Sequence, residues 1–397
     1  MSLIKKRNLL YLNSMPFEML AEQGRIWEVE GRNLGDYCEL ACSIYFGSDK
    51  NRIVEIEPGR NRCYCVKNTT FRIKMAIFRY LYRLYYFLKL IILIGVICRK
   101  NRIDAIVSQS NALRDLELAS LIVSKVLRIP MLGYMGRNYT TFKPNDCISR
   151  KILLLIETFV LHGVDGVILR PGSESFFLQY YKLNPEKIIT IPHTTRFSDS
   201  LVLTPLPENL KEWIGDRKLL LYYGRIEEDK LVADIIRSFH LLENIFSNIR
   251  LLLVGCGNDS KRYVDLANDL GIGNSLKWEN QMSHEKLAVI SSRADVHIHP
   301  TGGKGLLESA VMGRPVITYD TNTYDYGLIE HMKTGLKAQF RNVESMTECV
   351  KIYINDQSLA NRHGKALKRA AIAGSDQTVI QHKFSSAIER LISGKEI

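Results

Sequence analysis

The sequence predicts an α/β protein made of two Rossmann-like domains, each built on a doubly wound parallel sheet. Its 397 residues exceed the roughly 250–300 residues over which a single hydrophobic core keeps growing. Short apolar runs alternate with segments of helical period along most of the chain, which is typical of parallel sheets. One polar stretch that follows neither period interrupts this alternation. We therefore expect a first domain at 1–197, a linker at 198–217, a second domain at 218–375, and a C-terminal helix at 376–397 that packs back on the first domain.

In the first half of the chain, short apolar runs mark the strands, and longer segments with a period of about 3.6 residues mark the helices. Strands are predicted at 9–12, 104–107, 130–134, 166–169 and 187–191. Helices are predicted at 71–98, 116–127, 152–161 and 173–183. Residues 20–65 are mixed in pattern, which suits the start of an α/β domain, and we assign no individual element within them.

The same alternation restarts at Lys218. Strands are predicted at 219–223, 251–254, 275–278, 295–299 and 315–319. Helices are predicted at 231–246, 284–291 and 306–312, with another that ends at 270 and three last ones at 343–355, 357–373 and 377–393. This order predicts a second parallel sheet, and ligands bind such sheets at the loops that follow the strands.

The chain carries an excess of positive charge, +12 at neutral pH, within a composition that is typical of folded proteins: 46% hydrophobic and 24% charged. Such an excess attracts polyanions, which include nucleic acid, anionic lipid headgroups and nucleotide substrates. No nucleic-acid recognition motif accompanies the basic residues, so we do not expect nucleic acid as a partner.

The eight cysteines predict free thiols rather than a metal site. The close pairs, Cys38 with Cys42 and Cys63 with Cys65, do not repeat the spacing that structural zinc requires. Free thiols are typical of a reducing cytoplasm. The first eight residues are not followed by an apolar run with a small-residue cleavage site, so we expect no signal peptide.

Residues 71–98 combine apolar and aromatic side chains with basic ones, contain no acidic residue, and are closed by Arg99 and Lys100. The longest uncharged run, 90–98, falls well short of the roughly 20 residues that a spanning helix needs. A basic and strongly apolar helix fits contact with a membrane surface. The alternative is a long helix buried against the sheet, with its basic residues on the solvent-exposed edge. We expect membrane-surface contact through 71–100.

The glycine-rich turn at 302–305, between the predicted strand 295–299 and a short helix, is a candidate ligand site. Glycines let the backbone approach a ligand closely, and the amides at the start of a helix favour an anion. Lys304 adds a positive charge, and Glu308 lies one turn into the helix, where a carboxylate can accept hydrogen bonds from a ribose diol. Taken alone, this motif also fits an ordinary turn with a surface lysine.

Two more loops of this kind follow predicted strands of the second domain. Gly224 and Arg225 follow the first strand, with Lys230 a few residues later, and Gly255 and Gly257 follow the second. Together with the turn at 302–305, in this order and spacing, the set resembles the second domain of glycosyltransferase family 4. That family comprises retaining, sugar-nucleotide-dependent transferases of the GT-B fold.

The resemblance covers residues 218–340 well and the first domain in outline. It implies the GT-B fold, with two Rossmann-like domains facing an interdomain cleft. It assigns Arg225 and Lys230 to catalysis, because two fixed cations stabilise the negative charge of the leaving diphosphate. It implies that Glu308 holds the ribose. The donor-binding residues that it implies are Gly224, Gly255, Gly257, Gly303, Lys304, Gly305, Leu306 and Glu308.

The chain departs from this family at three places. The family carries a second glutamate eight positions before the ribose-binding one, and here Pro300 stands there, which leaves the donor sugar open. His193 to Thr195 replace a glycine and an aspartate that often follow the last strand of the first domain. Arg137 lies where the family carries a histidine; it is a candidate substrate contact, with a structural arginine as the alternative.

No metal site and no bound cofactor are predicted. No Asp-x-Asp motif occurs, so the metal-clamping motif of the other main glycosyltransferase fold is missing. His297 and His299 point the same way from one predicted strand. We interpret them as core or cleft histidines rather than as metal ligands.

The resemblance to glycosyltransferase family 4 implies that the protein is a retaining glycosyltransferase. It would move a hexose or N-acetylhexosamine from a nucleotide-diphosphate sugar to a saccharide acceptor, lipid-linked, for a surface polysaccharide such as lipopolysaccharide or capsule. We expect it in the cytoplasm, peripheral on the membrane. The alternatives are a sugar-nucleotide epimerase of the same fold, which would need no acceptor, and a non-catalytic partner protein that keeps the nucleotide site.

Overall fold

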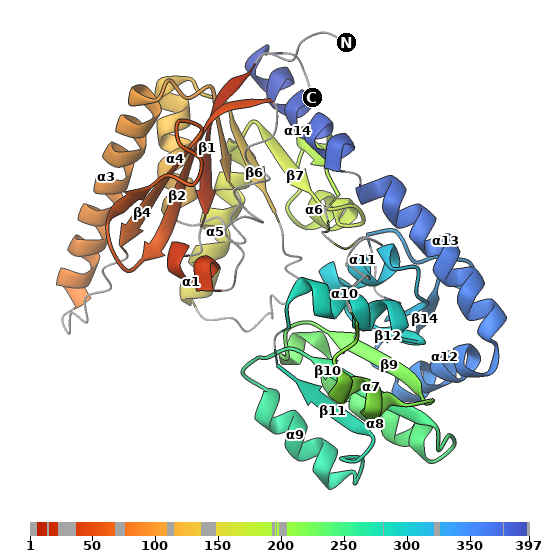
Figure 1. Cartoon of the computed structure of the whole chain (residues 1–397). Coiled ribbons are helices and arrows are strands. Elements are labelled where there is room, and N and C mark those ends of the chain that lie inside the picture. Colours follow the sequence, from red (N-terminus) through yellow and green to blue (C-terminus); the bar gives the residue numbers. More distant parts are fainter. Residues whose placement is uncertain are drawn as a thin grey trace. The chain divides into compact units, whose positions relative to one another are not determined.

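The computed structural model divides into two compact units, residues 1–191 with 378–397 and residues 192–377 (Figure 1). It describes residues 6–13, 16–22, 37–67, 76–108, 115–135, 148–192, 195, 197, 205–280, 282–320, 326–375 and 377–394. Each unit is an α/β structure with its own parallel sheet, as the sequence predicts.

The sheet of the first unit has eight strands in the order β3-β4-β2-β1-β5-β6-β7-β8. The strands are β1 (Arg7–Asn13), β2 (Cys38–Ser48), β3 (Arg52–Val54), β4 (Asn61–Lys67), β5 (Ala105–Ser108), β6 (Met131–Tyr134), β7 (Gly166–Leu169) and β8 (Ile188–Thr190). All neighbours are parallel except the edge strand β3, which runs antiparallel to β4. Three of these strands, β2 to β4, lie within or close to residues 20–65, where no individual element is assigned from the sequence.

Helices cover both faces of this sheet. They are α1 (Phe17–Glu22), α3 (Ala76–Lys100), α4 (Asp115–Leu127), α5 (Ile148–Gly163), α6 (Glu174–Tyr180) and α14 (Gln377–Ile392). Side chains alternate along each strand, so Leu10 and Leu12 of β1 pack with α3, α4 and α5, while Leu9 and Tyr11 pack with α14 on the other face. An ion pair fixes α14 to β1, because Arg7 donates from Nε and Nη2 to the two carboxylate oxygens of Glu389 at 2.7 and 2.8 Å.

The sheet of the second unit has six parallel strands in the order β11-β10-β9-β12-β13-β14. They are β9 (Lys218–Tyr223), β10 (Ile249–Val254), β11 (Leu276–Glu279), β12 (Val296–Ile298), β13 (Val316–Tyr319) and β14 (Leu336–Ala338). The chain adds β10 and β11 on one side of β9 and then returns to place β12 on the other side. The strand order therefore reverses between β9 and β12. Ligands of open α/β sheets bind at such a switch point.

Two layers of helices cover the second sheet. They are α7 (Glu208–Ile214), α8 (Val232–Glu243), α9 (Ser260–Asp269), α10 (His284–Arg293), α11 (Lys304–Val311), α12 (Val343–Asn355) and α13 (Gln357–Ser375). The side chains of Leu220 and Tyr222 on β9 pack with α8, α9 and α12. Those of Leu219, Leu221 and Tyr223 pack with α7, α10, α11 and α13 on the opposite face.

The predicted linker at 198–217 needs a correction, because its second half contains the helix α7. The side chain of Leu210 is buried in the core of the second unit, beside Leu206 and the partly buried Trp213. These apolar residues recur every three or four positions, which gives a short amphipathic helix. Pro205, Pro207 and Gly215 flank the helix, so its period is too short to be recognised in the sequence.

Candidate functional site

The loops that follow β9, β10 and β12 share one edge of the second sheet. These three strands are neighbours and run parallel, so their carboxyl ends lie side by side. The loop after β9 begins at Gly224, the loop after β10 begins at Gly255, and the loop after β12 runs from His299 into α11. The predicted donor-binding and catalytic residues all belong to these loops or to the first turns of the helices that follow them.

The loops after β9 and β10 approach each other so closely that two of their positions accept only glycine. The amide of Gly224 donates to the carbonyl of Val254 at 3.0 Å, and the amide of Ile226 donates to the carbonyl of Cys256 at 3.0 Å. A Cβ at Gly255 would lie 1.9 Å from the oxygen of Gly224, and a Cβ at Gly257 would lie 2.0 Å from the oxygen of Ile226. The backbones of the two loops are thus in direct contact next to Arg225.

Alanine at position 257 should destabilise the second unit, because its Cβ would collide with the backbone of Ile226. We expect Gly257→Ala to lower the free energy of unfolding by about 1–3 kcal/mol, as overpacking does. Urea unfolding followed by circular dichroism measures the change. Gly273→Ala is the matched control, because a Cβ there meets only Asn268 at 3.8 Å. Equal stability of both variants would contradict the close approach.

The loop after β12 leads into α11 through backbone that glycine favours. Gly303 precedes the helix with φ 90°, a conformation that other residues rarely adopt. Gly305 lies against β9 and β12, because a Cβ there would lie 2.9 Å from the carbonyl oxygen of Tyr223 and 2.8 Å from the ring of His299. The amides of Lys304, Gly305 and Leu306 belong to the first turn, where the helix itself offers no acceptor. This end of α11 therefore suits an anion.

Two cations of the loop after β9 stand at the same edge. The guanidinium of Arg225 hydrogen-bonds to the carboxylate of Glu227 and donates to Asp229 at 3.1 Å. Lys230 ends a single 3-10 turn, and its Nζ lies 3.8 Å from Asp229. The ammonium of Lys230 also acts on His299, whose pKa is lowered first by burial and in addition by this nearby charge. Lys230 follows β9, the strand that pairs with β12.

A second charged pair lies on α11. The carboxylate of Glu308 is buried, and the Nζ of Lys304, one turn earlier, lies 3.6 Å from it. Glu308 raises the pKa of the Tyr223 hydroxyl, although burial of that hydroxyl is the larger cause. Glu308 is thus close to the end of β9, and the structure brings the charged residues of the two loops to one edge of the sheet.

A cluster of polar side chains joins α11 to the strands β9 and β12, and the sequence alone does not predict it. The hydroxyl of Ser309 makes hydrogen bonds to Tyr223 Oη at 3.0 Å, His297 Nδ1 at 2.8 Å and His299 Nε2 at 2.9 Å. The hydroxyl of Tyr223 also donates to the carbonyl of Gly305 at 3.0 Å. Both histidines are buried, and burial lowers the pKa of His297 to about 3 and that of His299 well below its ordinary value. They are neutral at pH 7 and fix α11 to the sheet.

Neither histidine belongs to a metal cluster. No group of three or more His, Cys, Asp or Glu side chains that could hold a metal ion occurs among the residues that the structure describes. Cys38, Cys42, Cys63 and Cys65 are buried in the first unit and form no disulfide with one another. Arg137, the candidate substrate contact, lies outside the described residues.

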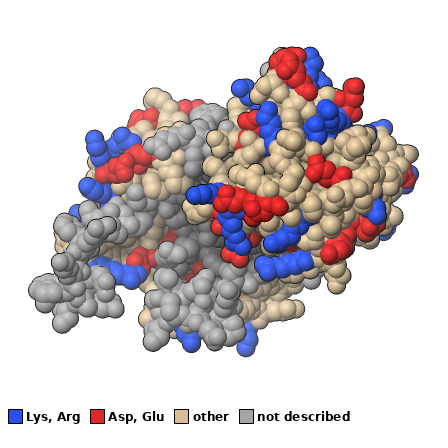
Figure 2. Space-filling view, turned by 90° about the horizontal axis from the view of Figure 1, so that it is seen from below, with Lys and Arg blue, Asp and Glu red and all other residues tan. Residues whose placement is uncertain are grey.

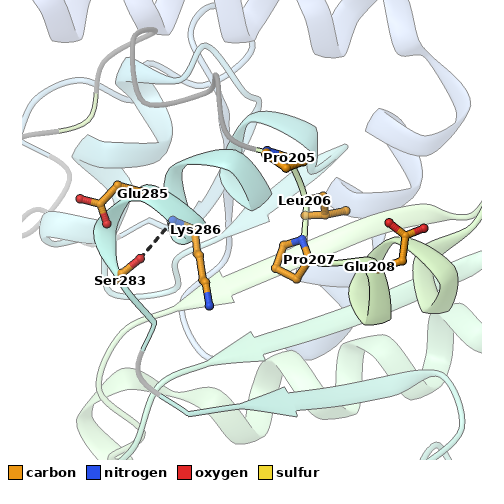
Figure 3. A pocket seen from close by; sticks show the side chains of 7 residues that line it. All are labelled: Pro205, Leu206, Pro207, Glu208, Ser283, Glu285 and Lys286. Carbon is orange, nitrogen blue, oxygen red and sulfur yellow. Dashed lines mark hydrogen bonds between the residues drawn. The ribbon is translucent and has the colours of Figure 1, made fainter.

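Figure 3 shows a pocket elsewhere in the second unit, between the beginnings of α7 and α10. It is lined by Pro205, Leu206, Pro207, Glu208, Ser283, Glu285 and Lys286. None of these residues is a predicted site residue. The backbone amide of Lys286 donates a hydrogen bond to the hydroxyl of Ser283, which caps the N-terminus of α10.

The excess of positive charge does not form one continuous tract on the face shown in Figure 2. There, lysine and arginine side chains of the described residues are interspersed with aspartate and glutamate. This distribution differs from the basic stripe that a nucleic-acid interface carries.

Residues 209–370 match the family model of "Glycosyl transferases group 1". This match covers most of the second unit. The match contains the three loops described above, so the predicted resemblance to glycosyltransferases is confirmed for this part of the chain. Assignment to family 4 in particular stays a prediction.

Two curated relatives and one solved structure illustrate what the chain is similar to. Glycogen synthase of Mycobacterium tuberculosis is 26% identical over 165 residues, 40% of each chain. The capsular polysaccharide biosynthesis glycosyltransferase CapM of Staphylococcus aureus is 23% identical over 198 residues, 46% of each chain. The matched part thus spans less than half the length of these relatives.

The solved structure is that of Anabaena HepE in complex with UDP-glucose. It is 14% identical, with a TM-score of 0.71, and the match covers 98% of this chain and 100% of that chain. The predicted GT-B fold, with two parallel-sheet α/β units, is therefore confirmed over the whole length, including the first unit that the group 1 match does not cover.

Proposed function

We propose that the protein is a retaining glycosyltransferase. It moves a hexose or N-acetylhexosamine from a nucleotide-diphosphate sugar to a saccharide acceptor. One observation carries this proposal: within the residues that match the group 1 family model, Arg225, Lys230 and the first turn of α11 lie at the loops around the switch point of the sheet. Cations and helix-end amides at one edge are suited to hold a diphosphate.

In the proposed reaction, the bond between the anomeric carbon and the diphosphate oxygen breaks while the acceptor oxygen bonds to the same carbon. Attack and departure take place on one face of the sugar, so the configuration at that carbon is retained. The acceptor proton passes to the leaving phosphate oxygen. Arg225 and Lys230 stabilise the negative charge that develops on the diphosphate, and they supply this charge without a metal ion. Glu308 accepts hydrogen bonds from the ribose.

Further support for the partners comes from the similar proteins. HepE binds UDP-glucose, which makes UDP-sugars the first donors to test here. CapM acts in capsular polysaccharide biosynthesis, which favours a saccharide acceptor for a surface polysaccharide. We propose a lipid-linked acceptor and a place on the cytoplasmic face of the membrane.

Nucleotide binding gives the first test. A ligand that binds only the folded protein stabilises it, by about 2.7 kcal/mol when its concentration is 100 times its dissociation constant. We therefore expect the diphosphate of the true donor base, chosen from UDP, GDP and ADP, to raise the melting temperature of the protein. The corresponding nucleoside, which lacks the diphosphate, should raise it much less. No shift with any of the three would contradict the proposed donor site.

Product analysis then separates the proposal from its two alternatives. Transfer of labelled sugar to a saccharide acceptor, with the anomeric configuration kept, supports the retaining transferase. Conversion of the donor sugar when no acceptor is present identifies an epimerase. Nucleotide binding without transfer or conversion identifies a non-catalytic partner, which the proline at position 300 would explain.

A further inference from the structure

Helix α3 exposes a continuous apolar stripe. Leu84, Leu88, Ile92 and Val96 recur every four residues, so they lie on one side of the helix. All four are more than half exposed, and Ile92 is 67% exposed. Leu81 and Tyr85 are exposed next to this stripe. Large apolar side chains scattered singly are ordinary on a protein surface, but a row of them along one helix marks a binding surface.

The two neighbouring helices extend this stripe. Helix α3 packs beside α4, and α4 packs beside α5, all on the same face of the first sheet. The outward side of α4 exposes Val126 by 71%, and that of α5 exposes Leu155 by 69% and Phe159 by 64%. Ile122 and Ile152 are also exposed. We call these outward sides the α3–α5 face.

The charge on the α3–α5 face is positive. Helix α3 contains no acidic residue between Ala76 and Lys100 and carries Arg83, Lys89, Arg99 and Lys100. Helices α4 and α5 contain three acidic residues. Asp115 is paired with Arg83 at 3.0 Å, and Glu117 and Glu157 are buried. The exposed part of the face therefore presents apolar and basic side chains to its partner.

Helix α3 is long and apolar enough to cross a membrane. The sequence does not predict this, because the longest uncharged run, 90–98, has only nine residues. Within residues 81–100, an 18-residue window has a mean hydropathy of 1.9, and only 22% of that window is buried. The opposite side of the helix is nevertheless part of the protein core, with Leu90 and Ile94 at most 2% exposed. The hydroxyl of Tyr86 donates to the carbonyl of Lys67 at 2.6 Å. A helix tied to a sheet in this way is part of the fold of the first unit and is not free to cross a membrane.

We propose that the α3–α5 face binds the surface of an anionic lipid bilayer. Its apolar side chains enter the boundary between headgroups and acyl chains, and its lysines and arginines contact the anionic headgroups. A bilayer fits better than a protein partner, because three helices side by side give a broad surface whose exposed side chains are apolar and basic. This inference uses no residue of the proposed donor site.

Vesicle flotation of the full chain tests the proposal. The vesicles consist of phosphatidylcholine, either alone or with about one third phosphatidylglycerol. Leu88→Glu combined with Ile92→Glu changes α3, and Leu155→Glu combined with Phe159→Glu changes α5. Ile245→Glu, at a 55% exposed position of the second unit, is the matched control. Lys89→Gln combined with Arg99→Gln removes charge only. Melting temperature and UDP binding are measured for every variant, so that a folding defect or a failed donor site is recognised separately.

We expect the wild type to float with the vesicles that contain phosphatidylglycerol and to bind phosphatidylcholine alone much more weakly. Each glutamate pair should reduce binding about tenfold or more, since it places charges where apolar area was buried. Ile245→Glu should float like the wild type, and the glutamine pair should reduce binding to the anionic vesicles only.

Failure of the wild type to float overturns the proposal. Normal flotation of the α5 variant overturns the part of the proposal that includes α5. A wild-type dimer that the glutamate pairs dissociate, without vesicle binding, shows that the face joins two copies of the chain.

Discussion

Replacement of Lys230 by alanine is expected to lower the rate of sugar transfer by about 10²–10³-fold, the loss that follows removal of one group that stabilises developing negative charge. The melting temperature should hardly change, because the pair of Lys230 with the half-exposed Asp229 is long, at 3.8 Å, and such surface pairs contribute little. Steady-state kinetics should show the loss mainly in kcat, since the charge on the leaving diphosphate is larger in the transition state than in the bound donor.

Two further variants make this prediction specific. Arg225→Ala should have an effect of the same kind, because the guanidinium is half exposed and its partners, the partly exposed Glu227 and the exposed Asp229, are acids that a diphosphate can replace. Lys261→Ala removes an exposed lysine of α9 in the same unit and should leave the kinetics unchanged. Full activity of both Lys230→Ala and Arg225→Ala would refute the assignment of the site, whatever their stability.

The parts of the fold that the sequence predicts well are those with a single strong period. The strand at 166–169 and the helix at 343–355 have the predicted bounds. Strand β2 escapes prediction, because Cys, Ser and Gly interrupt its apolar positions although its neighbours β1 and β4 bury it. Strand β14 has only three residues, too few to show a period, and it is defined by its pairing with β13. Both depend on contacts distant in the sequence, which a local pattern does not contain.

The candidate site divides in the same way. Its glycines can be predicted, since a loop that needs close backbone approach or positive φ excludes other residues, as at Gly257 and Gly303. The two cations can be predicted only through the family resemblance. The bonds from Ser309 to Tyr223 and to the two histidines cannot, because they join β9, β12 and α11. Alternation along the strand does predict that His297 and His299 share one side.

The buried histidines should make the second unit unstable in acid. Burial lowers the pKa of His297 to about 3 in the folded protein, whereas an unfolded chain has a histidine pKa near 6.5. Below about pH 6.5 the unfolded state therefore binds a proton that the folded state does not. The free energy of unfolding should fall as the pH falls from about 6.5 toward 3, by up to about 1.4 kcal/mol per pH unit for each such histidine.

The slope can be assigned to His297 by comparing variants. Urea unfolding at several pH values between about 6.5 and 4.5 should give a clearly shallower dependence for His297→Asn than for the wild type, even though the variant is less stable at pH 7 through loss of its bonds to Ser309 and Ser291. His382→Gln changes an exposed histidine and should keep the wild-type slope. If His297→Asn keeps it too, His297 is not the buried neutral group that the structure shows. The support of α11 by uncharged imidazoles would then be wrong. An acid-sensitive slope confined to His297 and its neighbour would instead mean that protonation loosens α11, the helix on which the proposed diphosphate site is built.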